Sequence, residues 1–113
     1  MERYLILTLG LMLFLSCGKE NSSLGSDCAM NMRSKFKGEI RCTKKGEMES
    51  NLYKGTYENK TVYFTMTMCS NCLTAPPSFG YTCDMEKVNF EDFNVNMKDI
   101  SQVYNSCTKQ FTE

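Results

Sequence analysis

The chain has 113 residues, of which 13 are basic and 13 acidic, and 42% are hydrophobic. This length supports one domain, and the balanced charge leaves no basic footprint for binding nucleic acid or an anionic membrane surface. The sequence contains no histidine, which removes the commonest general base and every Ser-His or Cys-His catalytic arrangement. We therefore expect a protein that is not an enzyme and uses no cofactor.

The first 16 residues have the pattern of an export signal. An apolar run from Tyr4 to Leu15 follows the basic Arg3. The run is shorter than the ~20 apolar residues that span a bilayer, but has the length of a signal-peptide core. We predict that residues 1–16 are a signal peptide and that the polar residues 17–27 form a flexible tether.

The end of this leader, Phe14-Leu15-Ser16-Cys17, resembles the lipobox of bacterial lipoproteins, with a small residue before the cysteine. The resemblance implies cleavage before Cys17 and attachment of diacylglycerol and a fatty acyl chain such as palmitate, which would anchor the protein in a bilayer. In such lipoproteins an Asp after the cysteine retains the protein at the inner membrane, so Gly18 implies the outer membrane. Cleavage after Gly18 by an ordinary signal peptidase is the main alternative, and would give a secreted cysteine-rich effector or inhibitor. A leader that stays uncleaved as an anchor is a third possibility.

The first predicted element of the mature domain is an amphipathic helix over 28–37. Ser26 or Asp27 can cap its start, and Cys28, Met32 and Phe36 recur on one face. After this helix we expect an irregular charged loop over 39–50.

The stretch from 51 to 69 gives the clearest structural pattern. Apolar Val62, Phe64, Met66 and Met68 alternate with polar or aromatic neighbours, as in a strand. A polar turn at 58–60 separates this strand from an earlier strand-forming arm, which predicts a β-hairpin.

Several short elements are predicted after the hairpin. Two consecutive prolines exclude helix and central strand over 73–78. The other expectations are a strand at 79–83, a turn at 84–87, a helical turn at 89–93, a strand or helical turn at 99–104, and a frayed tail at 109–113.

The mature part is similar to small exported lipoprotein domains of unknown function. The likeness spans Cys28 to Tyr104 and rests on a helix ending in Lys-Phe-Lys, a strand with Tyr53-Lys54, a strand from Lys60 to Phe64, and clustered cysteines. It implies a fold and a location in the cell envelope, but no reaction.

The cysteine count supports both the anchor and a disulfide framework. Of seven cysteines, lipidation of Cys17 leaves an even six, which allow fifteen pairings. In an exported protein these would form disulfides, each typically contributing about 2–4 kcal/mol, and would compensate for a thin core. The expected pairs are Cys28 with Cys42, and Cys69 and Cys72 with Cys83 and Cys107 in either order.

The CxxC spacing of Cys69 and Cys72 has two other interpretations. Thioredoxin-like redox catalysis needs such a pair at a helix N-terminus, whereas here Pro76-Pro77 leaves no room for a helix. A zinc site formed with Cys83 and Cys107 would lack paired spacing on its second side. We therefore expect structural disulfides and no metal.

Three tyrosines are the remaining candidates for a binding surface. Alternation places Tyr53 and Tyr57 on one face of their strand, and Tyr63 on the face opposite Phe64. An exposed tyrosine surface could bind a protein or a glycan, although tyrosines also fill the half-exposed side of a small sheet.

Together these patterns predict one small cysteine-rich α+β domain over 28–108. We expect an N-terminal helix packed on an antiparallel sheet centred on the hairpin, stapled by three disulfides. The predicted role is that of a non-catalytic binding or structural module in the cell envelope.

Overall fold

The computed structural model describes residues 26–70 and 72–113. The predicted signal peptide at 1–16, the lipid attachment at Cys17 and the tether up to residue 25 lie outside the described residues. Across the two described ranges, no helix combines the length and apolar character that crossing a bilayer requires.

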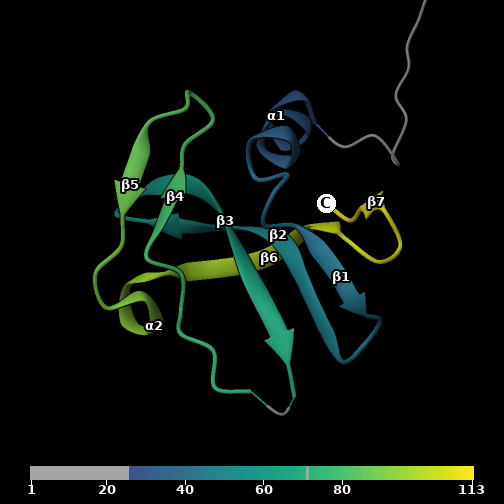
Figure 1. Ribbon diagram of the computed structural model, residues 1–113. Helices are drawn as coiled ribbons and strands as arrows, with labels where there is room; N and C mark the ends of the chain where they lie inside the picture. Colours follow the sequence, from purple (N-terminus) through teal and green to yellow (C-terminus); the bar gives the residue numbers. More distant parts are fainter. Residues whose placement is uncertain (1–25, 71) are drawn as a thin grey trace, which may run out of the picture.

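A seven-stranded antiparallel sheet forms most of the structure, with one main helix above it (Figure 1). The path of the sheet runs β5-β4-β3-β2-β6-β7, and β1 pairs with the start of β2 beside β6. The elements are α1 Asp27–Lys35, β1 Arg41–Lys44, β2 Met48–Tyr57, β3 Lys60–Cys69, β4 Phe79–Tyr81, β5 Lys87–Asn89, α2 Phe93–Asn96, β6 Lys98–Asn105 and β7 Gln110–Phe111. The expected disulfide-stapled antiparallel sheet with a helix is confirmed, although strands outweigh helix more than an α+β label suggests.

Helix α1 begins where a side-chain cap is available. The Ser26 hydroxyl accepts a hydrogen bond from the Ala29 amide at 3.1 Å, which satisfies one of the free N–H groups of the first turn. Ala29, Met32 and Phe36 are buried on the face that packs on the sheet. The predicted helix is confirmed, about one residue from its expected start.

The β2–β3 hairpin is the centre of the sheet, as predicted. Its ten-residue strands pair without a break from Met48–Cys69 to Tyr57–Lys60. Glu58 and Asn59 form the turn with φ of 50° and 65°, which is the left-handed backbone that a two-residue hairpin turn requires.

Both faces of this hairpin are covered, which the alternation did not reveal. Leu52 and Tyr63 pack under α1, whereas Val62 and Phe64 pack on the opposite face against Phe93, the first residue of α2. The sheet therefore separates two small hydrophobic cores.

The prediction of an irregular loop over 39–50 was wrong. Residues 41–44 form β1, which pairs with the first residues of β2 across a turn in which Gly46 has a φ of 76°. All four residues of β1 are exposed, so no buried alternation marks this edge strand in the sequence.

The second half of the chain matches expectation in part. Strand β4 and the turn after it are confirmed, and 99–104 is part of strand β6. The helical turn expected at 89–93 was misplaced, because Asn89 ends β5 and helix α2 begins only at Phe93.

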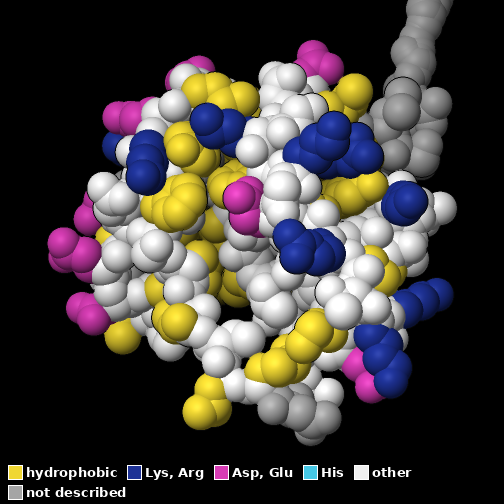
Figure 2. All heavy atoms as spheres, in the orientation of Figure 1, with side chains coloured by type: hydrophobic (Ala, Val, Ile, Leu, Met, Phe, Trp, Pro, Cys, Tyr) yellow, Lys and Arg dark blue, Asp and Glu magenta, His cyan; other side chains and the backbone are white. Residues whose placement is uncertain are grey.

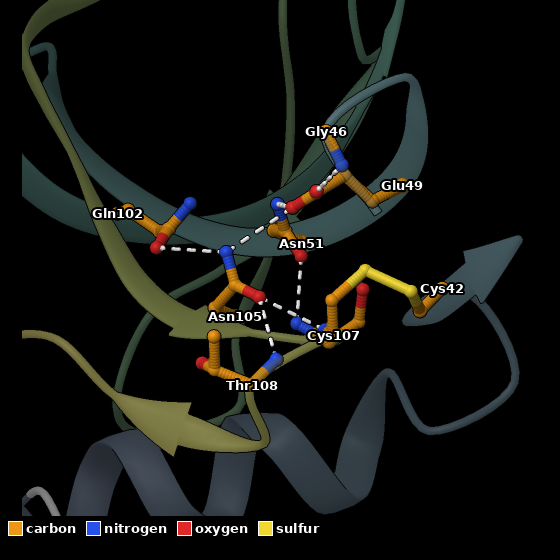
Figure 3. The surroundings of a disulfide bond; sticks show 9 residues. Cys42, Gly46, Glu49, Asn51, Gln102, Asn105, Cys107 and Thr108 are labelled. Atoms are coloured by element: carbon orange, nitrogen blue, oxygen red, sulfur yellow. Dashed lines mark hydrogen bonds between the residues drawn. A yellow bond between two sulfur atoms is a disulfide. The ribbon is translucent and has the colours of Figure 1, made fainter. Parts of the chain in front are cut away.

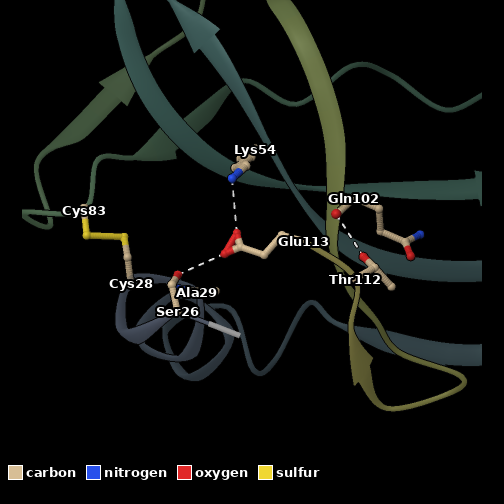
Figure 4. Close-up of polar contacts among 8 residues, drawn as sticks. All are labelled: Ser26, Cys28, Ala29, Lys54, Cys83, Gln102, Thr112 and Glu113. Carbon is tan, nitrogen blue, oxygen red and sulfur yellow. Dashed lines mark hydrogen bonds and ion pairs between the residues drawn. A yellow bond between two sulfur atoms is a disulfide. The ribbon is translucent and has the colours of Figure 1, made fainter. Parts of the chain in front are cut away.

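The prediction of a frayed tail at 109–113 was wrong. Strand β7 pairs with β6, and the Glu113 carboxylate accepts hydrogen bonds from Ser26 at 2.9 Å and from Lys54 at 3.2 Å (Figure 4). The end of the chain is thus held against the start of α1 and the middle of β2.

The expected disulfide pairing was also wrong. The three disulfides join Cys28 to Cys83, Cys42 to Cys107 and Cys69 to Cys72, with Cα–Cα distances of 5.5, 5.0 and 5.3 Å. The helix lies over β4, where Phe36 packs on Tyr81 with ring centroids 5.7 Å apart. Its first turn therefore meets the turn after β4 rather than the neighbouring strand β1.

Candidate functional site

A cleft of about 350 Å³ lies between α1 and the turn that joins β6 to β7. One wall is the outer side of the helix, and the other is the end of β6 with residues 106–109. Figure 2 shows lysine and arginine side chains gathered over α1. The residues that line the cleft are Arg33, Ser34, Lys37, Ile40, Tyr104, Ser106 and Lys109.

Three cationic side chains converge on this cleft. Arg33 lies in the last turn of α1 and Lys37 in the turn that follows the helix, and both line the cleft. The Arg33 guanidinium sits 4.8 Å from the centroid of the Tyr104 ring, a cation–π contact that fixes it on the wall. Lys109 approaches from the opposite side, in the turn closed by its own amide donating to the Asn105 carbonyl at 2.8 Å.

The electrostatics of the cleft favour an anion. Its lining contains no carboxylate, and within the part of the chain that the structure describes, none of its three cations is in an ion pair. Cations confined to one concave surface produce a positive potential that is stronger than on an open surface.

The turn carrying Lys109 is held rigidly. The Asn105 side-chain oxygen accepts hydrogen bonds from the amides of Cys107 and Thr108, both at 2.9 Å. The disulfide from Cys107 to Cys42 then ties the turn to β1 (Figure 3). The cleft is therefore pre-formed on its strand side.

Ser106 is the most informative residue in the cleft. It is only 7% exposed, and its amide donates to the Asn51 side-chain oxygen at 2.7 Å. Its hydroxyl, however, has no hydrogen-bond partner among the described residues. A buried polar group left unpaired costs about 1–3 kcal/mol, so this hydroxyl lacks the hydrogen bond that would compensate its burial.

Glu49 and Asn51 hold Ser106 in place through a chain of hydrogen bonds. The Asn51 amide donates to the Glu49 carboxylate at 2.7 Å, and Asn105 donates to the same carboxylate at 3.1 Å. The hydrogen bond from Asn51, followed by one from the Gly46 backbone amide, lowers the pKa of Glu49. Glu49 is thus held in its charged form as the centre of a buried polar network (Figure 3).

The lining of the cleft offers hydrogen-bond donors beside an apolar wall. Its polar groups are cations and hydroxyls, which can donate hydrogen bonds to an anionic group, while Ile40 and Tyr104 supply an apolar wall. The zinc alternative is overturned because its four cysteines are distributed over three disulfides.

The tyrosines predicted as a binding surface are mostly internal. Tyr57 and Tyr63 are 3% and 5% exposed, and belong to the cores on opposite faces of the sheet. Burial raises the pKa of Tyr63, and the Tyr57 hydroxyl accepts a hydrogen bond from the Glu91 amide at 2.9 Å. Tyr53 is half-buried and stacks on Phe64. The expected exposed surface is wrong because both faces of the hairpin are covered.

The sequence did not indicate this cleft. The cations of α1 are also what a helix C-terminus favours, and Lys109 fell in the tail expected to fray. The basic residues at 33 and 37, near the expected end of the helix, were the one available sign.

Comparison of the chain with models of known protein families, with curated proteins and with solved structures finds no match. The cleft is therefore interpreted from its own geometry. The resemblances of the leader and of the mature domain to bacterial lipoproteins remain predictions.

Proposed function

We propose that this protein is a membrane-tethered, exported binding module that holds a small anionic ligand in the cleft between α1 and the β6–β7 turn. The observation that carries the proposal is the buried, unpaired hydroxyl of Ser106 beside Arg33, Lys37 and Lys109. A hydroxyl and three cations around one concavity match the oxygens of a multiply charged anion.

The ligand that fits best is a compact phosphorylated molecule. Three cations balance a phosphate dianion better than a single carboxylate. The volume of about 350 Å³ is at the lower end of the range for small-molecule sites. Ile40 and Tyr104 offer an apolar surface to whatever carries the phosphate.

The proposed anchor rests on the leader and on the cysteines. The three disulfides take six of the seven cysteines, and the seventh is Cys17. This parity supports lipidation of Cys17 after removal of a signal peptide at 1–16. Residues between Cys17 and Ser26 would then let the domain stand off an outer-membrane surface.

Phosphate titration tests the binding proposal. Inorganic phosphate is added at constant ionic strength, and binding is followed by amide chemical-shift changes. Ser106→Ala and Lys37→Gln should each weaken binding at least tenfold, whereas Lys35→Gln should leave it unchanged. Lys35 is a matched control because its ammonium lies over the Tyr81 ring, away from the cleft. An equal loss in Lys35→Gln would mean that only net charge matters, and would contradict the site.

Metabolic labelling with a fatty-acid probe tests the anchor. Incorporation that disappears in Cys17→Ser supports the lipoprotein, and the mass of the mature N-terminus should show acylated Cys17. A mature chain that starts after Gly18 and is released into the medium would instead identify a secreted effector or inhibitor.

A further inference from the structure

The disulfide between Cys69 and Cys72 differs from the other two in what it connects. Cys69 is the last residue of β3, and Cys72 follows three residues later in an irregular segment. The bond therefore closes a four-residue loop and joins no two elements of the fold. One backbone hydrogen bond, from the Cys72 amide to the Cys69 carbonyl at 3.4 Å, accompanies it.

The other two disulfides join segments that the fold already holds together. Their sequence separations are 55 and 65 residues. Cys28 packs against the core under α1, and Cys107 lies in the turn fixed by Asn105. Because packing keeps these cysteine pairs close even when reduced, their disulfides re-form readily and resist reduction.

The segment that carries Cys69 and Cys72 is exposed and contains no charged residue. Cys72 is exposed and Cys69 half-buried. No residue from 61 to 83 is charged. Leu73 is fully exposed and Met68 is 42% exposed, and hydrophobic side chains reach the surface at this lower end of the molecule in Figure 2. A second protein can therefore meet the exposed Cys72 together with these apolar side chains. The exposed Glu47 lies nearby, next to Met48, which pairs with Cys69 in the sheet.

We propose that the Cys69–Cys72 disulfide is a thiol–disulfide exchange site whose reaction partner is a protein dithiol. A thiolate of the partner attacks the exposed Cys72 sulfur, forming a mixed disulfide and releasing Cys69 as a thiolate, which takes up a proton. The second thiolate of the partner then attacks the partner's own sulfur in that bond, and releases Cys72, which is protonated in turn. Two electrons pass to this chain, and the partner is left with a disulfide.

This exchange differs from thioredoxin-like catalysis. No helix starts at Cys72, because residues 73–77 are irregular, so the pair lacks the helix N-terminus that thioredoxin-like catalysis requires. The pair accepts electrons from a partner without unfolding the domain, since neither core and neither of the long-range disulfides depends on it.

Equilibration in dithiothreitol redox buffers tests the proposal. The purified native chain is quenched by alkylation at each ratio of reduced to oxidised dithiothreitol, and its peptides are mapped by mass. Cys69 and Cys72 should become alkylated at a ratio about tenfold lower than the other four cysteines, with the far-ultraviolet circular dichroism unchanged. Opening of all three disulfides at one ratio, or of this disulfide last, would overturn the proposal.

Two sets of variants complete the test. Cys69→Ser with Cys72→Ser should leave the melting temperature nearly unchanged, whereas Cys28→Ser with Cys83→Ser should lower it clearly. Equal losses would show that the short disulfide is structural.

The direction of attack is tested by single replacements. With oxidised glutathione, Cys69→Ala leaves the exposed Cys72 thiol and should form a mixed disulfide several-fold faster than Cys72→Ala. The reverse order would contradict attack at Cys72.

Discussion

Replacing Ser106 by alanine separates binding from stability. The change removes the buried hydroxyl but keeps the amide hydrogen bond to Asn51 at 2.7 Å. In most buried positions a serine hydroxyl has a partner, so its loss destabilises the fold. The Ser106 hydroxyl has no hydrogen-bond partner among the described residues. Its removal therefore takes an unpaired polar group out of the folded state.

The magnitude follows from two opposing effects. Removing an unpaired buried hydroxyl raises the free energy of unfolding by about 1–3 kcal/mol. The small cavity left by one oxygen lowers it by a few tenths of that amount. The expected net gain in unfolding free energy is about 1 kcal/mol, which corresponds to about 4–8 °C in melting temperature for a domain of this size. A hydrogen bond to a charged ligand contributes about 1.5–3 kcal/mol, so phosphate affinity should fall by about 10- to 100-fold.

Urea unfolding with and without phosphate measures both effects. Both titrations are run at equal ionic strength, with chloride replacing phosphate in the control. Phosphate at a hundred times its dissociation constant should stabilise the wild-type chain by about 2.7 kcal/mol, and the variant much less. If Ser106→Ala instead loses 1 kcal/mol or more without phosphate, the hydroxyl has a structural partner and the reasoning fails.

Other variants address the sheet, its polar network and the C-terminus. Gly80→Ala should cost about 1–3 kcal/mol in urea unfolding, because the added Cβ would collide with the Tyr63 carbonyl oxygen, whereas Gly38→Ala, with open space around it, should cost far less. Glu49 has a lowered pKa in the folded chain, so its contribution to stability should be complete above the ordinary glutamate value of about 4.3 and be lost as the pH falls through the folded pKa. The urea midpoint should therefore decline between pH 7 and pH 3. The decline should be smaller in Glu49→Gln. Deleting Glu113 should lower the free energy of unfolding by about 0.5–1 kcal/mol in calorimetry, since its 3.2 Å ion pair with Lys54 of β2 is only partly exposed. An unchanged free energy would mean that this ion pair does not stabilise the fold.

The hairpin was predictable because its information is local. Alternation over 61–68 and the polar turn at 58–60 fix the pairing without reference to the rest of the chain. Helix α1 was predictable for the same reason, from Ser26 as its cap and from the spacing of Met32 and Phe36.

The disulfides and the cleft depend on long-range packing. Cys28 meets Cys83 only because α1 crosses over β4, which no local pattern specifies. Lys109 and Ser106 reach the cleft through the pairing of β7 with β6, in a segment whose polar composition resembles a loose tail. Strand β1 was missed because all its side chains are exposed.

The meeting of Glu113 with the N-cap of α1 makes this domain suited to circular permutation. The hydrogen bond between the Ser26 and Glu113 side chains places Glu113 beside the start of α1, so a short Gly-Ser linker can join Glu113 to Ser26 once the residues before Ser26 are removed. New ends can then be cut in the exposed turn between β1 and β2. A permuted chain would keep both hydrophobic cores. A reporter protein fused at the new ends would then be attached at the β1–β2 turn instead of beside the start of α1.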